Sequence, residues 1–231
     1  MGNNCPSSLK HQPPTTEGAP KHPERPEGSD KFPISLPHRY EVIVAEADDI
    51  PAGNLEDHIY SGIFLNHKRK KFWVDEKSGC NCFTLFAREL SITWGNDKRY
   101  WEWYSWQEAR FATVEVARLL KVVWLEIDGK FDISYLTPGA TYQLSFLVLM
   151  IDDPSNGWDV PVNLSLTVPT GNKQTCQVEM KDKPKEQWLE LVVGEFKTTT
   201  SSKGDIEFSL YQNQDWKSGL IVKGVSFRPK K

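Results

Sequence analysis

The chain has 231 residues, with 28 lysines and arginines against 31 aspartates and glutamates, which gives a formal net charge of −3. This balance excludes a protein that coats nucleic acid or anionic membranes with its whole surface, because such a protein carries a large excess of positive charge. Four cysteines are too few for a disulfide framework in a chain of this length, so a reducing compartment is expected.

Residues 1–38 predict a disordered tail and not a domain. They hold eight of the fifteen prolines and almost nothing apolar before Phe32, so they cannot bury enough surface to offset the entropy of ordering. No apolar stretch follows the start, so we expect no secretory signal peptide and a protein that stays inside the cell. Gly2 and Cys5 fit a myristoyl and palmitoyl pair that would attach the chain to a membrane surface, although Pro6 departs from the usual pattern; an ordinary disordered start is the alternative.

Residues 39–62 predict a short helical lead-in. Four apolar side chains recur there with helical spacing: Tyr40, Ile43, Val44 and Ala47. A strand is the rival interpretation of this first stretch. Asn54 can cap a second helix over 55–61, and Gly62 is placed to end it.

From residue 63 onward the pattern is that of strands, and no further helix is expected. Apolar and polar residues alternate with a period of two over 162–168 and 206–211, which is typical of antiparallel strands with one buried face. Further apolar runs bring the expected total near ten: 71–74, 81–87, 114–119, 122–127, 142–151, 188–193 and 220–227. Many short strands without long helices between them predict an all-β protein, with a jelly-roll-like antiparallel β-sandwich over 63–231.

Spaced catalytic signatures are absent from the sequence. We find no nucleotide-binding glycine motif, no serine-hydrolase elbow and no zinc-protease motif, and His58 and His67 are the histidines that remain after residue 38. We therefore expect no enzyme, no cofactor and no metal site. A glycosidase that uses a pair of carboxylates stays formally open.

Tryptophan is the unusual feature of the sequence. Four of the nine tryptophans fall within thirteen residues, around a Gly-Asn-Asp turn: Trp94, Trp101, Trp103 and Trp106. Because such a loop runs over the surface, we expect at least one of these indoles to face solvent. Core packing is the alternative for each single ring.

An exposed indole can stack on the apolar face of a pyranose, while neighbouring polar groups bind the hydroxyls. The residue types in this loop match that chemistry, so the sequence predicts a carbohydrate site. Its members in the loop are Trp94, Asn96, Asp97, Tyr100 and Trp101.

The same loop carries a family resemblance. Residues 90–94, LSITW, and 100–103, YWEW, resemble the signature of the plant phloem protein 2 family. Eight further segments occur in that family's order: 61–65, 71–75, 124–127, 136–139, 157–158, 193–196, 216–219 and 223–229. A chain with its own tail in place of an F-box resembles the A-type branch.

This resemblance implies a non-catalytic jelly-roll lectin. Its expected ligands are N-acetylglucosamine oligomers and the N-glycan cores of glycoproteins. The expected setting is the cytoplasm, the nucleus or the phloem sieve elements of a plant, with a role in the phloem or in stress and defence responses.

Two positions on a late strand also follow from the resemblance. In the related tobacco-type lectins the sugar-contacting tryptophans match Trp94 and Trp101, and two acidic residues match Asp205 and Gln212. Seven residues on an extended strand span about 24 Å and give opposite side-chain directions, so these two cannot line one sugar pocket. We prefer Gln212, at the strand end, although its amide makes a weaker, neutral contact and simple strand termination is the alternative.

Adaptor functions form the main alternative to a lectin. The run His67-Lys68-Arg69-Lys70-Lys71 is the one dense basic segment, and the resemblance also implies RNA carriage, although such a run is usually solvated surface. By the same resemblance Cys5 or Cys80 would crosslink the chain to phloem filament proteins on oxidation, whereas burial is the simpler expectation for Cys80 and Cys82. The sequence leaves open whether the domain forms a homodimer.

Overall fold

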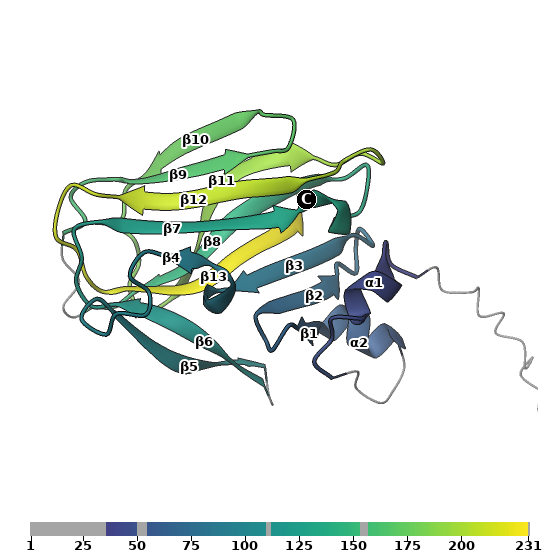
Figure 1. Ribbon diagram of the computed structural model, residues 1–231, viewed down its shortest axis with the longest axis horizontal. Coiled ribbons are helices and arrows are strands. Elements are labelled where there is room, and N and C mark those ends of the chain that lie inside the picture. The colour runs from purple at the N-terminus through teal and green to yellow at the C-terminus, as the bar shows by residue number, and fades with distance from the viewer. Residues whose placement is uncertain (1–35, 50–54, 110–111, 153–156, 231) are drawn as a thin grey trace, which may run out of the picture. The chain divides into compact units, whose positions relative to one another are not determined.

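The computed structural model describes residues 36–49, 55–109, 112–152 and 157–230, whose strands form two antiparallel sheets packed face to face (Figure 1). The all-β sandwich expected from the sequence is therefore confirmed. Most of the expected tail, with Gly2 and Cys5, lies outside the described residues. None of the described helices is long and apolar enough to cross a membrane.

Two short helices precede the strands, α1 (Tyr40–Val44) and α2 (Leu55–Ser61). The expected apolar face of the first is confirmed, because Ile43 is buried and its three partners pack against the core. Gly62 ends α2 as expected: its φ is 100°, and its N–H donates to the His58 carbonyl at 2.9 Å. Asn54, the expected cap, lies outside the described residues. Two single 3₁₀ turns, η1 (Ala87–Glu89) and η2 (Ile133–Tyr135), have no counterpart in the sequence-based expectation.

The larger sheet has eight strands. They are β1 (Ile63–Leu65), β2 (Lys70–Val74), β3 (Asn81–Phe86), β5 (Trp101–Ala109), β6 (Ala112–Leu119), β8 (Thr141–Met150), β11 (Trp188–Lys197) and β13 (Leu220–Pro229). β13 lies at the centre of this sheet, because one of its edges pairs with β8 while the other pairs first with β6 and then with β3. β11 extends the sheet beyond β8, and β2 with β1 extends it beyond β3.

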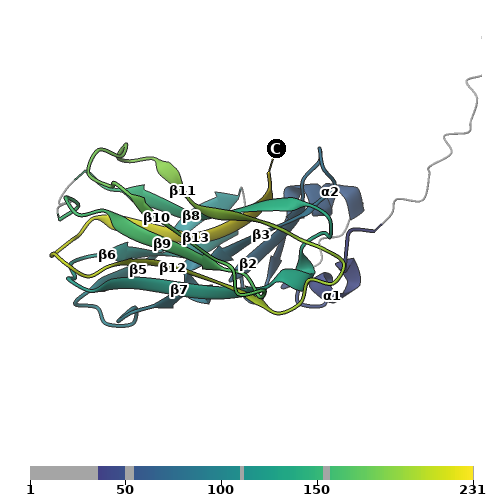
Figure 2. The same ribbon diagram turned by 90° about the horizontal axis from the view of Figure 1, so that it is seen from above.

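The smaller sheet has five strands. Their order is β10 (Lys173–Val178), β9 (Val162–Thr167), β12 (Asp205–Gln212), β7 (Leu125–Asp132) and β4 (Ser91–Ile92). In Figure 2, β12 and β7 of this sheet lie below β8 and β13 of the larger one.

Side chains from the inner faces of both sheets form the core. Phe208 of the smaller sheet lies edge-on to Phe146 and Phe227 of the larger one, with 5.9 Å between ring centroids in each pair. β12 alternates as expected, because Ile206, Phe208 and Leu210 are at most 2% exposed. The sheets thus fix the direction of every outward side chain, which is what positions a surface site.

Candidate functional site

Three tryptophans are about half exposed at one end of the sandwich. Trp94 is 50% exposed, Trp124 47% and Trp216 51%. They lie in the connections from β4 to β5, from β6 to β7 and from β12 to β13. We call residues 93–100, 120–124 and 212–219 the loop end; it is on the left of Figure 1.

Strand register brings these three connections together. β4 pairs with Ile127 and Asp128 in the first half of β7, so residues 93–95 run beside the start of β7. Val122 forms a bridge with Lys217, and the Leu120 N–H donates to the Tyr100 carbonyl at 2.8 Å. Of the three exposed tryptophans, the sequence-based expectation placed only Trp94 in the site. Trp124 falls within the apolar run 122–127 that predicted a strand, and Trp216 follows an Asn-Gln-Asp turn; both also lie in segments that carry the family resemblance, 124–127 and 216–219.

The Trp94 loop is closed by its own backbone. Trp94 has a φ of 56°, and the N–H groups of Gly95 and Asp97 donate to the Ile92 and Trp94 carbonyls at 2.8 Å each. The Trp94 ring lies 5.2 Å from the Tyr100 ring, tilted by 38°. The loop therefore holds the indole in one place while half of the side chain stays open to solvent.

Two further indoles support this loop from within. Trp101 is 2% exposed and its Nε1 donates to the Thr93 carbonyl at 3.1 Å. Two residues on, the half-buried Trp103 donates to the Gly95 carbonyl at 2.6 Å. For Trp101 the structure shows core packing, the alternative left open by the sequence, because strand alternation turns its ring inward. The expected stacking of Trp101 on a sugar does not agree with this position.

The two polar loop residues of the expected site, Asn96 and Asp97, differ in whether their side chains are already hydrogen-bonded within the protein. Asp97 accepts hydrogen bonds from the Arg99 backbone N–H at 3.0 Å and from the Arg99 guanidinium at 2.6 and 3.0 Å. These bonds lower the pKa of the Asp97 carboxyl below its usual value. Asn96 is exposed and borders a hollow of about 550 Å³ with Lys98, Trp103 and other residues. The Asn96 amide therefore stays open to solvent, whereas Asp97 shapes the turn.

Gln212 and Asp205 lie at opposite ends of β12, as expected. Gln212 pairs with Leu125 and Asp205 with Asp132, and the two side chains point to opposite faces of the sheet. Gln212 is 1% exposed, its Oε1 accepts from the Gln214 N–H at 3.0 Å, and its Nε2 is buried without a partner in the described residues. Asp205 is exposed, 3.7 Å from Lys130. A direct sugar contact by Gln212 stays a prediction, and the burial of its side chain argues against it.

Lys217 ties two connections of the loop end together from inside. Its side chain is 0% exposed, although lysine is a residue that normally stays in water. Its ammonium donates to the carbonyls of Gln212 at 3.1 Å, Asp215 at 2.5 Å and Val123. Burial lowers the pKa of Lys217 to about 8. The buried cation thus fixes residues 212–217 against residues 122–124.

Gly157 and Trp158 support the same region from the next loop. The Trp158 Nε1 donates to the Ser218 carbonyl at 2.8 Å. Gly157 has a φ of 80°, and a Cβ there would lie 1.6 Å from the Trp216 carbonyl oxygen. The Gly-Trp pair and the segment 216–219, far apart in sequence, therefore form one packed unit.

The basic run does not form one continuous patch. His67 and Lys68 stand in a left-handed turn whose backbone N–H groups donate to the Asp48 carboxylate. On β2, Lys70 lies 3.5 Å from the carboxylates of Glu46 and Glu89, while Lys71, the next residue, points to the other face. RNA binding by this run stays a prediction that this arrangement does not strengthen.

The three cysteines in the described part of the chain are free thiols. Cys80 and Cys82 are buried, as the simpler expectation had it, and burial raises the pKa of Cys82 to about 12. Cys176 is partly exposed. Because the thiolate is the reactive form of cysteine, Cys80 and Cys82 are poorly placed for crosslinking to filament proteins. Cys5 lies outside the described residues.

The matching family model and the similar sequences agree on one family. Residues 80–229 match the family model described as Phloem protein 2. The chain is 43% identical to Protein PHLOEM PROTEIN 2-LIKE A1 of Arabidopsis thaliana over 205 residues, which cover 85% of this chain and 82% of that protein. It is 41% identical to a lectin of Luffa acutangula over 203 residues, 85% of this chain and 96% of that one. Among solved structures, TmCBM61 in complex with β-1,4-galactotriose aligns with a TM-score of 0.36 at 13% identity, over 61% of this chain and 87% of that one. The chain belongs to the phloem protein 2 family.

Proposed function

We propose that this protein is a non-catalytic lectin that binds carbohydrate at the loop end, with Trp94 as the stacking platform. The carrying observation is a half-exposed indole on a loop that is held in place by its own backbone, the buried Trp101 and the half-buried Trp103. The 41% identical lectin of Luffa acutangula supports the same function class.

The energetics of one stacked sugar set the expected affinity. Covering one face of a pyranose removes about 70 Å² of apolar surface from water, which contributes roughly 2 kcal/mol before the costs of association. A Kd of about 1 mM for a single sugar corresponds to about 4 kcal/mol, so hydrogen bonds to the hydroxyls must supply the rest. Useful affinity then requires an oligosaccharide with several contacts, or several copies of the lectin on one glycan.

N-acetylglucosamine oligomers and N-glycan cores are the ligands that we propose. The exposed Asn96 amide offers both a donor and an acceptor, which the acetamido group of such a sugar can pair. Trp101 and Gln212 take a supporting role in this proposal, since both lie beneath the surface of the loop end. In the plant, we place the protein in the phloem or in stress and defence responses.

Calorimetric titration of the full-length protein with chitotriose tests this proposal. Replacing Trp94 by Ala should weaken binding about thirtyfold, the equivalent of the lost stacking energy. Trp106→Ala is the matched control, because Trp106 packs edge-on against Trp188 at 5.1 Å on the outer face of the larger sheet, away from the site. Unchanged binding in a folded Trp94→Ala variant, or no heat from the parent protein at millimolar sugar, would overturn the proposal.

A further inference from the structure

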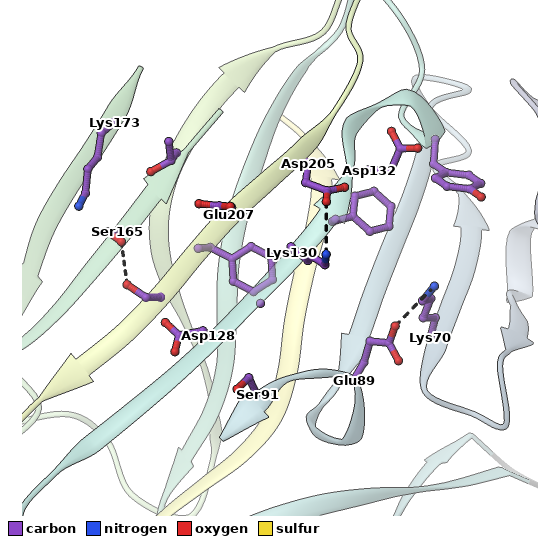
Figure 3. A pocket seen from close by; sticks show the side chains of 16 residues that line it. Lys70, Glu89, Ser91, Asp128, Lys130, Asp132, Ser165, Lys173, Asp205 and Glu207 are labelled. Carbon is purple, nitrogen blue, oxygen red and sulfur yellow. Dashed lines mark hydrogen bonds and ion pairs between the residues drawn. The ribbon is translucent and has the colours of Figure 1, made fainter. Parts of the chain in front are cut away.

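The outer face of the smaller sheet carries a hollow of about 740 Å³ (Figure 3). Its floor is a row of short side chains in direct register across four strands. The row runs from Ser91 through Asp128 and Ser209 to Ser165. Longer side chains stand in the next row, where Lys130 pairs with Glu207. Short residues beside long ones make a trough across the sheet.

Polar groups on the floor of the trough are available to a ligand. Asp128 has no hydrogen bond or ion pair with any described residue, and burial beside Glu126 raises the pKa of its carboxyl. Glu207 also has no such partner in the described part of the chain. The Ser165 and Ser209 hydroxyls lie 2.7 Å apart and each keeps further hydrogen-bonding capacity. The floor therefore offers acceptors and donors at close spacing.

One aromatic ring lies in the next row toward the loop end, and a second lies beside that row. Glu126 and Tyr211 face each other there on β7 and β12, and Tyr211 is 40% exposed. The Trp124 indole donates to the Glu126 carboxylate at 2.8 Å, which holds the ring beside this row. Apolar rings thus lead from the loop end to the polar floor, which is the combination that a sugar chain with alternating C–H faces and hydroxyl edges requires.

The length of this surface exceeds one sugar. Six residues separate Trp124 from Lys130 along β7, a distance of about 20 Å for an extended strand. One hexose cannot reach from the indole to the far wall of the trough, whereas a chain of several hexoses can.

The charges around the trough select against acidic chains. Five carboxylates and three lysines line it, so acidic groups are in excess by two. Two of the lysines already face carboxylates, Lys130 at 3.7 Å from Asp205 and Lys70 at 3.5 Å from Glu89. A polyuronate would meet net repulsion on this face, and an uncharged sugar chain would not.

We propose that this trough is a second carbohydrate subsite, joined to the loop end by Trp124 and Tyr211, and that the preferred ligand is an extended, uncharged oligosaccharide. The inference rests on the proposed lectin function. It adds the length and the charge class of the ligand, and it assigns contacts to Asp128, Glu207 and Tyr211.

A length series tests the subsite. Full-length protein is titrated by calorimetry with N-acetylglucosamine, chitotriose and chitohexaose, and with a galacturonic acid hexamer as the acidic probe. The hexamer of N-acetylglucosamine should bind about tenfold more tightly than the trimer, and the acidic hexamer should give no saturable heat. Tyr211→Ala and Asp128→Asn should remove the tenfold gain and leave trimer binding unchanged.

Matched controls separate the two proposals. Glu190→Gln, on β11 of the other sheet, should leave all affinities unchanged, and Trp94→Ala should weaken trimer and hexamer alike.

Equal affinity of trimer and hexamer, hexamer binding untouched by the Tyr211 and Asp128 variants, or strong binding of the acidic hexamer would overturn the subsite while the lectin proposal stands. If the parent protein binds none of the sugars, the lectin proposal fails. If Asp128→Asn abolishes trimer binding that Trp94→Ala leaves intact, the trough is supported as the primary site and the proposed role of Trp94 is overturned.

Discussion

Tryptophans at the loop end differ from the tryptophans of the larger sheet in what lies over their rings. Trp94, Trp124 and Trp216 are about half exposed. On the larger sheet, the half-buried Trp73 and Trp188 each have a cation over the ring, with Arg228 at 5.7 Å and Lys223 at 4.7 Å. The Lys223 ammonium forms an ion pair with Glu108 at 3.0 Å, and both side chains are largely buried. This ion pair fixes the ammonium over the Trp188 ring.

This difference shows that an abundance of tryptophan does not mark a site. A cation that lies over an indole occupies the ring face on which a ligand would otherwise stack. Trp216 lies between the two classes, since Lys121 stands 5.0 Å from its ring while the side chain stays 51% exposed. The proposed site rests on rings that are both accessible and immobilised, so substitutions in the residues that support the loop end test it.

The largest expected effect comes from Gly157→Ala. The new Cβ would lie 1.6 Å from the Trp216 carbonyl oxygen, and the φ of 80° is itself unfavourable for alanine. Residues 216–219 must then move, so we expect a loss of about 3 kcal/mol in the free energy of unfolding. Urea unfolding followed by circular dichroism measures this loss.

Gly139→Ala is the matched control for that substitution. Gly139 has a similar φ of 84°, but a Cβ there would meet nothing within 4 Å. Only the backbone strain remains, so the expected loss is about 1 kcal/mol. Equal losses for the two variants would show that the contact with Trp216 does not hold this end of the molecule.

Lys217→Met is expected to have the next largest effect. It removes the donor that three backbone carbonyls share, which should destabilise the fold by about 2 kcal/mol at neutral pH. Lys121→Met, which removes an exposed cation from the same end, should change the stability by less than about 0.5 kcal/mol.

The pH dependence of that loss tests the burial of Lys217. Burial lowers the pKa of Lys217 from 10.5 to about 8, so between these values the unfolded chain binds more protons than the folded one. The stability that comes from this group is therefore fully present above about pH 10.5 and is lost as the pH falls through about 8. The advantage of the parent protein over Lys217→Met should grow across this window in urea titrations. An advantage independent of pH would mean that water reaches the amine.

Much of the fold could be predicted from the sequence, because period-two alternation and turn residues are local signals. The helix over 55–61, its end at Gly62 and the alternation along β12 all follow from such signals. The strands β1, β4 and β10 were not expected, since the first two have three and two residues and the third carries mainly polar residues.

The site was less predictable, because exposure depends on which loops meet in space. Alternation along 101–106 gives two sets of side chains but does not say which set faces the core, so the burial of Trp101 could not be read from it. Trp124 and Trp216 gain their place only when Val122 pairs with Lys217. The floor of the trough has no local signal at all, since register alone brings its four short residues together from four strands.

The smallest expected effect concerns the ring beneath Trp94. Tyr100→Ala removes the aromatic neighbour at 5.2 Å, so the indole must be ordered when a sugar binds and the affinity for chitotriose should fall by about 1 kcal/mol. Tyr100→Phe keeps the ring and should bind as the parent protein does. If both variants lose the same affinity, the Tyr100 hydroxyl contacts the sugar directly. If neither variant loses affinity, the hydrogen-bonded turn alone keeps the Trp94 ring exposed. The backbone then accounts for the contrast with the tryptophans that a cation covers.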